Sequence, residues 1–404
     1  MKVFISDAIG HERLPFSNSK EIVYGKAHYS WKLISKMYHE ALEKIHIHTW
    51  NISAPDIYQS EEARHLAHIS AEDIHIAVKP IEHIRPMFGV RNFFVCGWEF
   101  PEFSKECLDG NPNNNYVAIM KRAERVMCWS SFSASNLKRY GVRSAVALPP
   151  PVVALMDKRH EFSGDIVCCH YAPSEPHNFA YSSLGAVREN YHHVFFIVMN
   201  PWDRRKNFAS LVQAFTKYKS SIGKSKKSAL VIKLVIDNVT TLAEHSIEIL
   251  EKHFGTENIS EDIYFFGKNI LSSQMVGLYK KFDFYISSSS AEGLNLPLIE
   301  AMAVGMVPIS STATAMGDYI TEENALVLPT SSATADAHFS ALAGSLKLTH
   351  FPPEQEELMT SFAKATDMTS AMRNAKSARA RQTVEERYGL SRFDQDFRKV
   401  AGVQ

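Results

Sequence analysis

The sequence lacks the features that mark membrane, secreted and nucleic-acid-binding proteins. No apolar run approaches the ~20 residues that span a bilayer, and the start MKVFISDAIG is too short and polar for a signal peptide. Lys+Arg and Asp+Glu both number 44, a balance that argues against a dedicated nucleic-acid binder. The five cysteines show no zinc-like spacing, and an odd number fits a disulfide framework poorly. We therefore expect a cytoplasmic protein from a reducing compartment.

Signatures of metal binding are also missing from the sequence. The only Asp-x-Asp triplet, Asp394-Gln395-Asp396, falls in a helix-like tail and is expected to be a solvated face. His46 with His48, and His192 with His193, have no neighbouring carboxylate or cysteine that would complete a ligand set. We expect no metal and no cofactor.

Apolar runs typical of strands alternate with amphipathic runs typical of helices. The first series predicts strands at Lys2–Ala8, Asp73–Val78 and Asn92–Cys96, and helices at Trp31–Lys44, Val117–Met127 and Ser133–Tyr140. The second predicts strands at Val194–Met199, Ala229–Ile236, Ile263–Phe266, Phe284–Ser287 and Val307–Ser310, and helices at Phe208–Lys219, Thr241–Phe254, Ser272–Lys281 and Pro297–Val304. This alternation predicts an α/β protein with two doubly wound, Rossmann-like domains.

The break between the two series lies at three successive prolines, Pro149 to Pro151, which fit neither a helix nor a central strand. Little periodicity follows through Pro173 and Pro176. We place the first domain at 1–165 and the second at 166–384, and we expect a last helix, about 385–404, to pack back on the first domain.

The most informative stretch runs from Ser289 to Gly305, directly after a predicted strand. Gly293 lets the backbone approach a ligand, and Pro297 suits the first turn of a helix. The free amides of such a turn, with the positive end of the helix dipole, bind phosphate or sugar oxygens. Glu292 and Glu300 could accept hydrogen bonds from neighbouring hydroxyls of a ribose or a hexose. Two isolated glutamates would favour a turn cap and a solvated helix residue, but this strand, glycine loop and helix favour a ligand site.

A basic loop, Asp203-Arg204-Arg205-Lys206-Asn207, lies between a predicted strand and an amphipathic helix. Fixed cations can stabilise the negative charge that develops on a departing diphosphate, Arg by forked contacts and Lys as a point charge. On charge alone, a solvated turn would be the better interpretation.

Together these segments resemble family 4 of the retaining glycosyltransferases. Glu292 and Glu300 fit its E-x7-E motif within S-x-x-E-G-x-x-L-P-x-x-E-A-M-A-x-G, and Arg205-Lys206-Asn207 fits an R-K-N loop before an L-x-x-A-F helix. The resemblance implies the GT-B fold, with two Rossmann-like domains facing across a cleft. It further implies that Glu300 holds the ribose of the donor, that Glu292 contacts the transferred sugar and that Lys206 binds the diphosphate. The amides that meet the sugar and the diphosphate would be those of Gly293, Leu294 and Asn295.

One departure from the family concerns a second cation. The family often has a Gly-Arg pair earlier in the basic loop, where this chain has Met199-Asn200. Arg205 and Arg204 are the two alternative replacements. The loop 267–275, which includes Gly267 and Lys268, is expected to contact the base.

The first domain is expected to hold the acceptor. Gly10 follows the first predicted strand and is expected to approach the diphosphate. The stretch Gly97-Trp98-Glu99-Phe100 resembles a W-E element, so Glu99 is a candidate contact to the acceptor or the transferred sugar, with a structural role equally open. Trp31, Trp50 and Trp129 are expected to pack in cores rather than to stack on sugars.

The resemblance implies a retaining, metal-independent glycosyltransferase that moves a hexose-type sugar from a UDP- or GDP-type nucleotide sugar to a saccharide or lipid-linked saccharide acceptor. Cell-surface polysaccharide synthesis is the expected setting. The alternative is a catalytically inactive, glycosyltransferase-like scaffold in a polysaccharide assembly complex. The altered Gly-Arg element, and the absence of a histidine between His83 and His160, leave it open. A phosphorylase is disfavoured because no pyridoxal phosphate lysine signature is present.

No nucleic-acid partner is expected. Lys138, Arg139 and Arg143 leave open a peripheral contact with anionic lipid at the inner face of the cell membrane. A solvated helix end is the interpretation that we favour for them.

Overall fold

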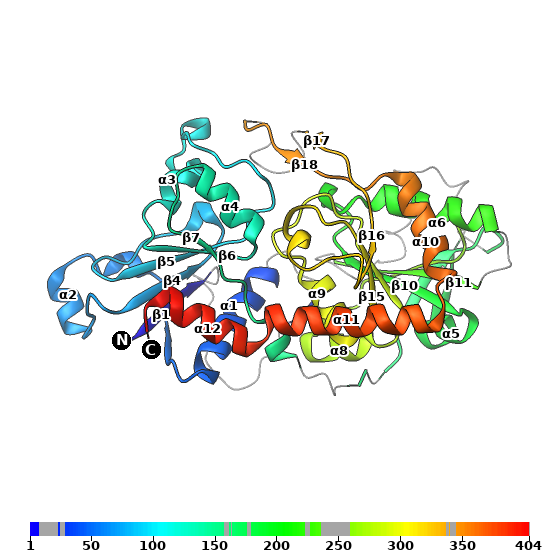
Figure 1. Ribbon diagram of the computed structural model, residues 1–404, viewed down its shortest axis with the longest axis horizontal. Helices are drawn as coiled ribbons and strands as arrows, with labels where there is room; N and C mark the ends of the chain where they lie inside the picture. Colours follow the sequence, from blue (N-terminus) through cyan, green and yellow to red (C-terminus); the bar gives the residue numbers. More distant parts are fainter. Residues whose placement is uncertain are drawn as a thin grey trace.

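The computed structural model describes residues 1–7, 23–24, 29–156, 161–162, 164–175, 179–222, 227–235, 259–336, 339 and 345–403. Two α/β domains lie side by side, and the last long helices run along both of them (Figure 1). Gly10 and the predicted helix Thr241–Phe254 lie outside the described residues.

The first domain is built on a parallel sheet of order β3-β1-β4-β5-β6-β7. Its strands are β1 Val3–Asp7, β3 Thr49–Asn51, β4 Ile74–Val78, β5 Arg91–Cys96, β6 Arg125–Cys128 and β7 Ala145–Ala147. Its helices are α1 Tyr29–Lys44, α2 Glu61–Leu66, α3 Tyr116–Met120 and α4 Ser131–Arg139. Strand β4 is buried along its whole length, as is typical of a parallel sheet that is covered on both sides.

The second domain is built on a larger sheet of order β16-β15-β14-β10-β11-β12-β8-β9. The strands from β16 to β12 in this order run parallel, whereas β8 and β9 form an antiparallel hairpin at one edge. These strands are β8 Val167–Tyr171, β9 Phe179–Ser183, β10 His193–Met199, β11 Ser228–Leu234, β12 Ile263–Phe266, β14 Phe284–Ile286, β15 Val307–Ser310 and β16 Leu326–Val327. The helices of this half are α5 Leu184–Asn190, α6 Phe208–Ile222, α8 Ser272–Tyr279, α9 Leu296–Val304, α10 Gln355–Thr366 and α11 Ser370–Tyr388.

Two sequence-based assignments differ from the structure. The predicted helix Val117–Met127 ends at Met120, and the strand β6 begins at Arg125. Met127 and Cys128 lie in β6 and pair with β5 on one side and β7 on the other. Tertiary pairing thus outweighs the helical spacing of the apolar residues. The segment after the prolines, which showed little periodicity, contains the hairpin of β8 and β9.

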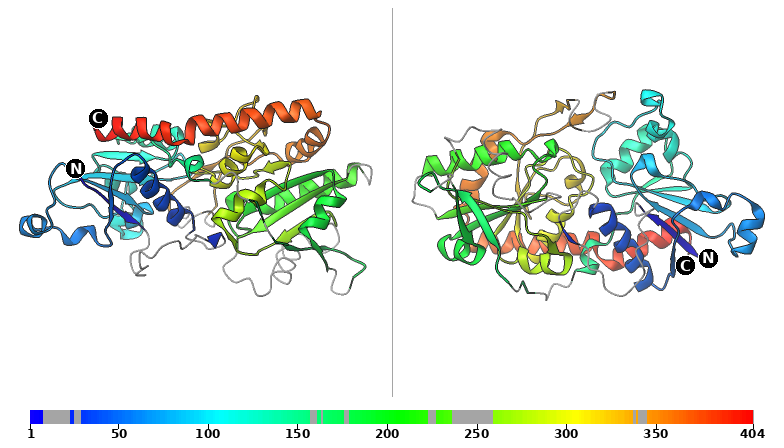
Figure 2. Two further views of the ribbon diagram at one scale, coloured as in Figure 1. Left: turned by 90° about the horizontal axis from the view of Figure 1, so that it is seen from below. Right: turned by 180° about the vertical axis from the view of Figure 1, so that it is seen from behind.

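The chain crosses back to the first domain in its last helix, α12 (Leu390–Ala401), so that the two termini lie close together (Figures 1 and 2). Arg91 in β5 donates a hydrogen bond to the carbonyl of Ala401 at 2.8 Å, and Arg398 donates one to the carbonyl of Ile45 at 3.1 Å. Phe393 packs against Tyr38 with ring centroids 5.9 Å apart. These contacts fix α12 to the first domain.

The two domains also meet in smaller contacts. Strand β2 (Val23–Tyr24) pairs with β13 (Ile270–Leu271) of the second half. Asp318 in the second domain accepts a hydrogen bond from the amide of Ser131 at 2.7 Å, and a second from its hydroxyl, and so caps the start of α4 across the interface. The short hairpin of β17 (Ala333–Thr334) and β18 (Thr349–His350) reaches toward the first domain, where Glu102 accepts a hydrogen bond from the amide of Thr349 at 2.8 Å.

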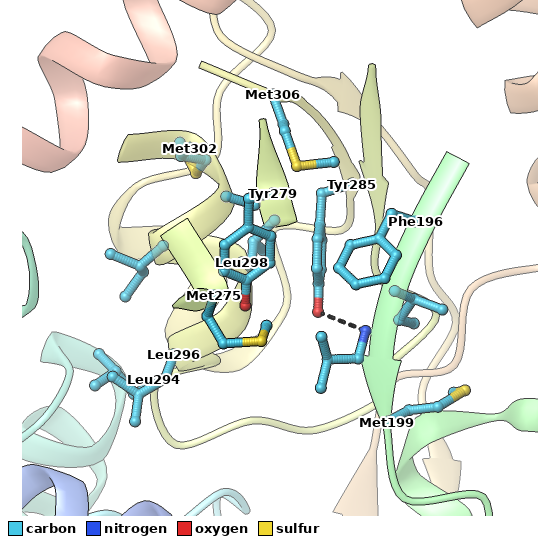
Figure 3. Packing of buried hydrophobic residues seen from close by; sticks show 14 of the residues in the cluster. Phe196, Met199, Met275, Tyr279, Tyr285, Leu294, Leu296, Leu298, Met302 and Met306 are labelled. Atoms are coloured by element: carbon cyan, nitrogen blue, oxygen red, sulfur yellow. Dashed lines mark hydrogen bonds between the residues drawn. The ribbon is translucent and has the colours of Figure 1, made fainter. Parts of the chain in front are cut away.

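Aromatic side chains fill the core between the second sheet and helices α8 and α9. Phe196, Tyr279 and Tyr285 converge there, and the hydroxyl of Tyr285 accepts a hydrogen bond from the amide of Val198 at 3.3 Å (Figure 3). Both buried hydroxyls thus have partners, since that of Tyr279 donates to the carboxylate of Glu300 in α9 at 2.9 Å.

One buried charge in this sheet carries a testable cost. The amine of Lys233, in β11, is buried and finds no hydrogen-bond partner among the described residues, and burial lowers its pKa to about 8. Because the folded state holds this proton more weakly than the unfolded chain, stability rises with pH between about 8 and 10.5.

Lys233→Met is therefore expected to raise the free energy of unfolding by about 3 kcal/mol at pH 7 and to remove that alkaline rise. Chemical denaturation at pH 7 and pH 10 measures both effects. A variant that is no more stable than the wild type at pH 7 would contradict the assignment of a buried, unpaired charge.

Candidate functional site

Two loops that are far apart in the sequence are joined at the carboxyl edge of the second sheet. The turn Arg204–Lys206 follows β10, and the loop 287–295 follows β14. The hydroxyl of Ser288 donates to the carbonyl of Lys206 at 2.6 Å, and the amide of Ser290 donates to the carbonyl of Arg205 at 2.7 Å. These bonds follow from the fold, because the ends of neighbouring parallel strands meet at one edge.

Two asparagines in left-handed backbone conformations shape these loops. Asn207 (φ 51°) starts α6, and its side-chain amide donates to the carbonyl of Ser288 at 2.8 Å. Asn295 (φ 62°) precedes α9, and its side-chain amide donates to the hydroxyl of Ser287 at 3.0 Å. Asparagine tolerates this conformation better than most residues, so both turns are encoded locally.

The resulting site brings Lys206 and Glu292 together. Their ammonium and carboxylate groups form an ion pair, and the Glu292 side chain is only 8% exposed. The pair lies where the free ends of β10 and β14 face the first domain. Lys206 thus presents a positive charge whose position is fixed by a buried partner.

Arg205 crosses the interface between the domains. Its guanidinium contacts Glu99 of the first domain at 2.6 Å and Asp203 of its own loop at 2.7 Å. Burial raises the pKa of Glu99. Burial alone would lower the pKa of Arg205, but the attraction of the carboxylates Glu99, Asp203 and Glu292 outweighs burial and raises the pKa of Arg205. Burial would also raise the pKa of Asp203, but Arg205 and Lys206 outweigh it and lower that pKa.

The glycine loop before α9 leaves its amides unused. Gly293, Leu294 and Asn295 donate no backbone hydrogen bond to any residue in the described part of the chain, and Asn295 does not cap the helix with its side chain. A methyl group on Gly293 would lie 2.2 Å from the carbonyl oxygen of Gly97 in the first domain. The loop therefore offers free donors at a helix N-terminus, in a place where only glycine fits.

Glu300 lies next to the site rather than in its wall. Its side chain is buried in α9, and it accepts a hydrogen bond from the hydroxyl of Tyr279 at 2.9 Å. The structure therefore separates the two glutamates, with Glu292 facing the cleft and Glu300 behind it.

A cavity of about 410 Å³ between the domains contains most of these groups. Its second-domain wall consists of Val198, Met199, Asn200, Asp203, Arg205, Lys206, Val235 and residues 292–297. Its first-domain wall consists of Trp31, Ile34, Pro80, Ile81, Glu82, Gly97, Trp98, Glu99, Tyr116 and Trp129. A cavity of this size with a few convergent polar groups is the usual form of a small-molecule site.

In a comparison with known protein families, one family model matches part of the chain. Residues 187–344 match the model of the family Glycosyl transferases group 1. This stretch of the chain is similar to group 1 glycosyl transferases. No curated protein matches the sequence.

Solved structures resemble the chain in fold. Sucrose-phosphate synthase from Thermosynechococcus elongatus has a TM-score of 0.63 at 13% identity, over 99% of this chain and 98% of that one. An alpha,alpha-trehalose-phosphate synthase from Burkholderia vietnamiensis has a TM-score of 0.58 at 12% identity, over 99% and 98%. A mutant of S. aureus TarM, in complex with Fondaparinux, alpha-GlcNAc-glycerol and UDP, has a TM-score of 0.51 at 11% identity, and this chain covers 56% of its length. The predicted GT-B fold, with two Rossmann-like domains, is confirmed.

Of the residues that the sequence predicts for the site, the structure brings some together at the cavity and places others outside it. Lys206, Arg205, Glu292 and Glu99 meet at the cavity with the loop Gly293-Leu294-Asn295. Of the two alternative arginines, Arg205 lines the cavity, whereas Arg204 pairs with Asp336 outside it. Gly267 and Lys268 also lie outside the wall, and the amine of Lys268 donates to the carbonyl of Asp165 at 3.4 Å.

The sequence interpretation missed several residues of the first-domain wall. Glu82 and Tyr116 carry no local signal, because they come from a turn and a short helix that only the fold brings together. The core prediction for the tryptophans is wrong for Trp50, which is 43% exposed. Trp31 and Trp129 pack against each other with ring centroids 4.8 Å apart, and both also line the cavity.

No group of three or more His, Cys, Asp or Glu side chains that could hold a metal occurs in the described ranges. All five cysteines are free thiols, and Cys107 is the exposed one. Within the same part of the chain, no helix has the length and apolar character needed to cross a membrane.

Proposed function

We propose that the protein is a retaining glycosyltransferase of family 4 that transfers a hexose-type sugar from a UDP- or GDP-type donor, without a metal, to a saccharide or lipid-linked saccharide. The observation that carries the proposal is the junction of Lys206 and Glu292 with the free amides of Gly293 to Asn295. Cations and helix N-terminal amides together suit a diphosphate. The family match of this domain supports the same activity.

The proposed mechanism assigns each group a separate task. Lys206 stabilises the negative charge on the departing diphosphate, and the amides of the Gly293 loop share that charge. Glu292 faces the transferred sugar, where a carboxylate stabilises the cationic character that develops as the bond to the diphosphate breaks. We assign the binding of the ribose to Glu300, whose carboxylate lies behind the cavity wall and accepts a hydrogen bond from Tyr279. The acceptor hydroxyl attacks from the face that the leaving group vacates.

Arg205 and Glu99 link this chemistry to the approach of the two domains. Their ion pair spans the cleft, so in the proposal closure of the domains brings Glu99 to Arg205, which Asp203 already holds within its own loop. Closure of this kind excludes water and limits hydrolysis of the donor. Gly10, in the proposal, approaches the diphosphate from the first domain, and Gly267 and Lys268 approach the base.

An inactive scaffold is the second candidate, and one observation favours it. Asn200 stands where the family often has an arginine, and Arg205 and Lys206 already face carboxylate partners. A donor-binding lobe without turnover would fit this balance. The setting in cell-surface polysaccharide synthesis at the inner face of the membrane belongs to the proposal in both cases.

A thermal-shift screen with UDP, GDP and ADP and their common sugars tests the donor site. A nucleotide at 100 times its dissociation constant should stabilise the fold by about 2.7 kcal/mol, whichever candidate holds. We expect UDP or GDP, and the matching nucleotide sugars, to raise the melting temperature. A flat response across the whole panel would contradict both candidates.

A further inference from the structure

We infer that the acceptor is a neutral saccharide, without phosphate or carboxylate groups, that stacks on Trp98 and donates a hydroxyl hydrogen bond to Glu82. This inference rests on the proposed function and adds the chemical class of the acceptor. It comes from the first-domain wall of the cavity, which the donor does not need for its phosphates.

The indole of Trp98 is a preformed platform on that wall. Its ring nitrogen donates to the carbonyl of Glu102 at 2.6 Å, and its ring meets Phe100 and Tyr116 edge-on at 5.4 and 5.3 Å. These contacts fix the ring, which remains partly exposed to the cavity. A fixed indole suits the apolar face of a pyranose ring, because little side-chain entropy is lost on binding.

Glu82 supplies the polar contact beside that platform. The hydroxyl of Tyr116 donates to one carboxylate oxygen of Glu82 at 3.2 Å, which orients the group. The other oxygen lies 4.0 Å from His83, beyond hydrogen-bonding distance, and the side chain is 36% exposed. One oxygen is thus available to accept from a sugar hydroxyl.

The charges of the cavity disfavour an anionic acceptor. Among the described residues, its wall has four carboxylates (Glu82, Glu99, Asp203 and Glu292) and two cations, Arg205 and Lys206. Both cations belong to the second domain, where the proposed diphosphate would engage them. A phosphate on an acceptor at Trp98 would therefore face the Glu82 carboxylate, which has no described lysine or arginine partner, and Glu99, whose partner Arg205 is shared with Asp203.

Two other described cations of the first domain, Arg85 and Lys79, are held elsewhere. Arg85 donates to the carbonyls of Glu82 and Ile84 at 3.2 and 2.9 Å and faces a different cavity. Lys79 does not line the wall, and Asp7 and Asp56 attract its charge. Neither is placed to neutralise an acceptor phosphate at Trp98.

The test compares matched pairs of sugars on the intact protein at pH 8, saturated with UDP or GDP. Saturation-transfer NMR would give dissociation constants for glucose, mannose and N-acetylglucosamine and for their 6-phosphates, with maltose and lactose as longer neutral sugars. We expect at least one neutral sugar to bind tenfold or more tightly than its 6-phosphate. Equal or tighter binding of the 6-phosphates, or no binding of any neutral sugar, would overturn the inference.

Two variants at one position make the test specific. Glu82→Gln keeps an acceptor for Tyr116 and removes the charge, so the preference for neutral sugars should fall at least threefold. Glu82→Arg should reverse the preference. An unchanged preference in both variants would also overturn the inference. The thermal shift with UDP or GDP should persist in both variants. Absence of this shift in the wild type would instead count against the proposed function.

Discussion

Replacing Lys206 with alanine is expected to lower turnover at saturating donor on the order of 100-fold, because one fixed charge on the leaving diphosphate is lost. The effect should appear in kcat more than in KM, since the diphosphate gains charge as it departs. Steady-state kinetics with a donor identified by the thermal-shift screen measures both constants.

The matched control for this charge is Lys217→Ala, an exposed lysine on α6 of the same domain, which should leave kcat unchanged. Lys206→Ala also leaves Glu292 without its ion pair, so its melting temperature must be compared with that of the wild type. A properly folded Lys206→Ala variant that keeps turnover within about threefold would exclude the role in the departure of the leaving group.

A second large effect is expected from Gly293→Ala. The added methyl group would lie 2.2 Å from the carbonyl oxygen of Gly97, and backbone rather than a flexible side chain would have to move. The two domains would then be held apart at the reacting centre, where misplacement by about 1 Å can cost roughly 100-fold in rate. We expect a loss of that order in kcat/KM.

Gly185→Ala is the control for this substitution, because a methyl group there meets only the hydroxyl of Ser183 at 3.5 Å. It should leave kcat/KM unchanged. Small-angle X-ray scattering with bound UDP or GDP should show a larger radius of gyration for Gly293→Ala than for the wild type. A Gly293→Ala variant with wild-type kinetics would mean that the catalytic state does not need the close contact with Gly97.

The second-domain side of the candidate site could be predicted from the sequence because its signals are local. The turn at Gly293, the proline at the start of α9 and the cations after β10 each lie within a few residues of a strongly apolar strand. Neighbouring parallel strands end at one edge, so the meeting of Lys206 with Glu292 follows from the strand pattern itself.

The contacts between domains could not be predicted in the same way. The bond from Arg205 to Glu99 depends on how two domains are oriented, and no periodicity in either segment encodes that orientation. The pairing of Tyr116 with Glu82, within the first domain, could not be predicted either, because it joins a five-residue helix to a turn 34 positions earlier.

The secondary-structure error at β6 has a physical origin as well. Strand β6 has only four residues, Arg125–Cys128, and the last three are buried, so it is too short to establish an alternating pattern. Their apolar neighbours Ile119 and Met120 belong to α3, so helical spacing continues by coincidence into the strand. The two cysteines Cys96 and Cys128, partners across β5 and β6, illustrate how pairing decides the structure there.

The proposed glycosyltransferase activity requires turnover, and release of nucleoside diphosphate by the purified wild-type protein tests this activity most directly. The sample would contain the nucleotide sugar that stabilises the fold and a neutral acceptor, and NMR would follow the anomeric proton of the product. We expect diphosphate release and a product with the same anomeric configuration as the donor. Binding of the nucleotide sugar without diphosphate release, or a product of inverted configuration, would contradict it.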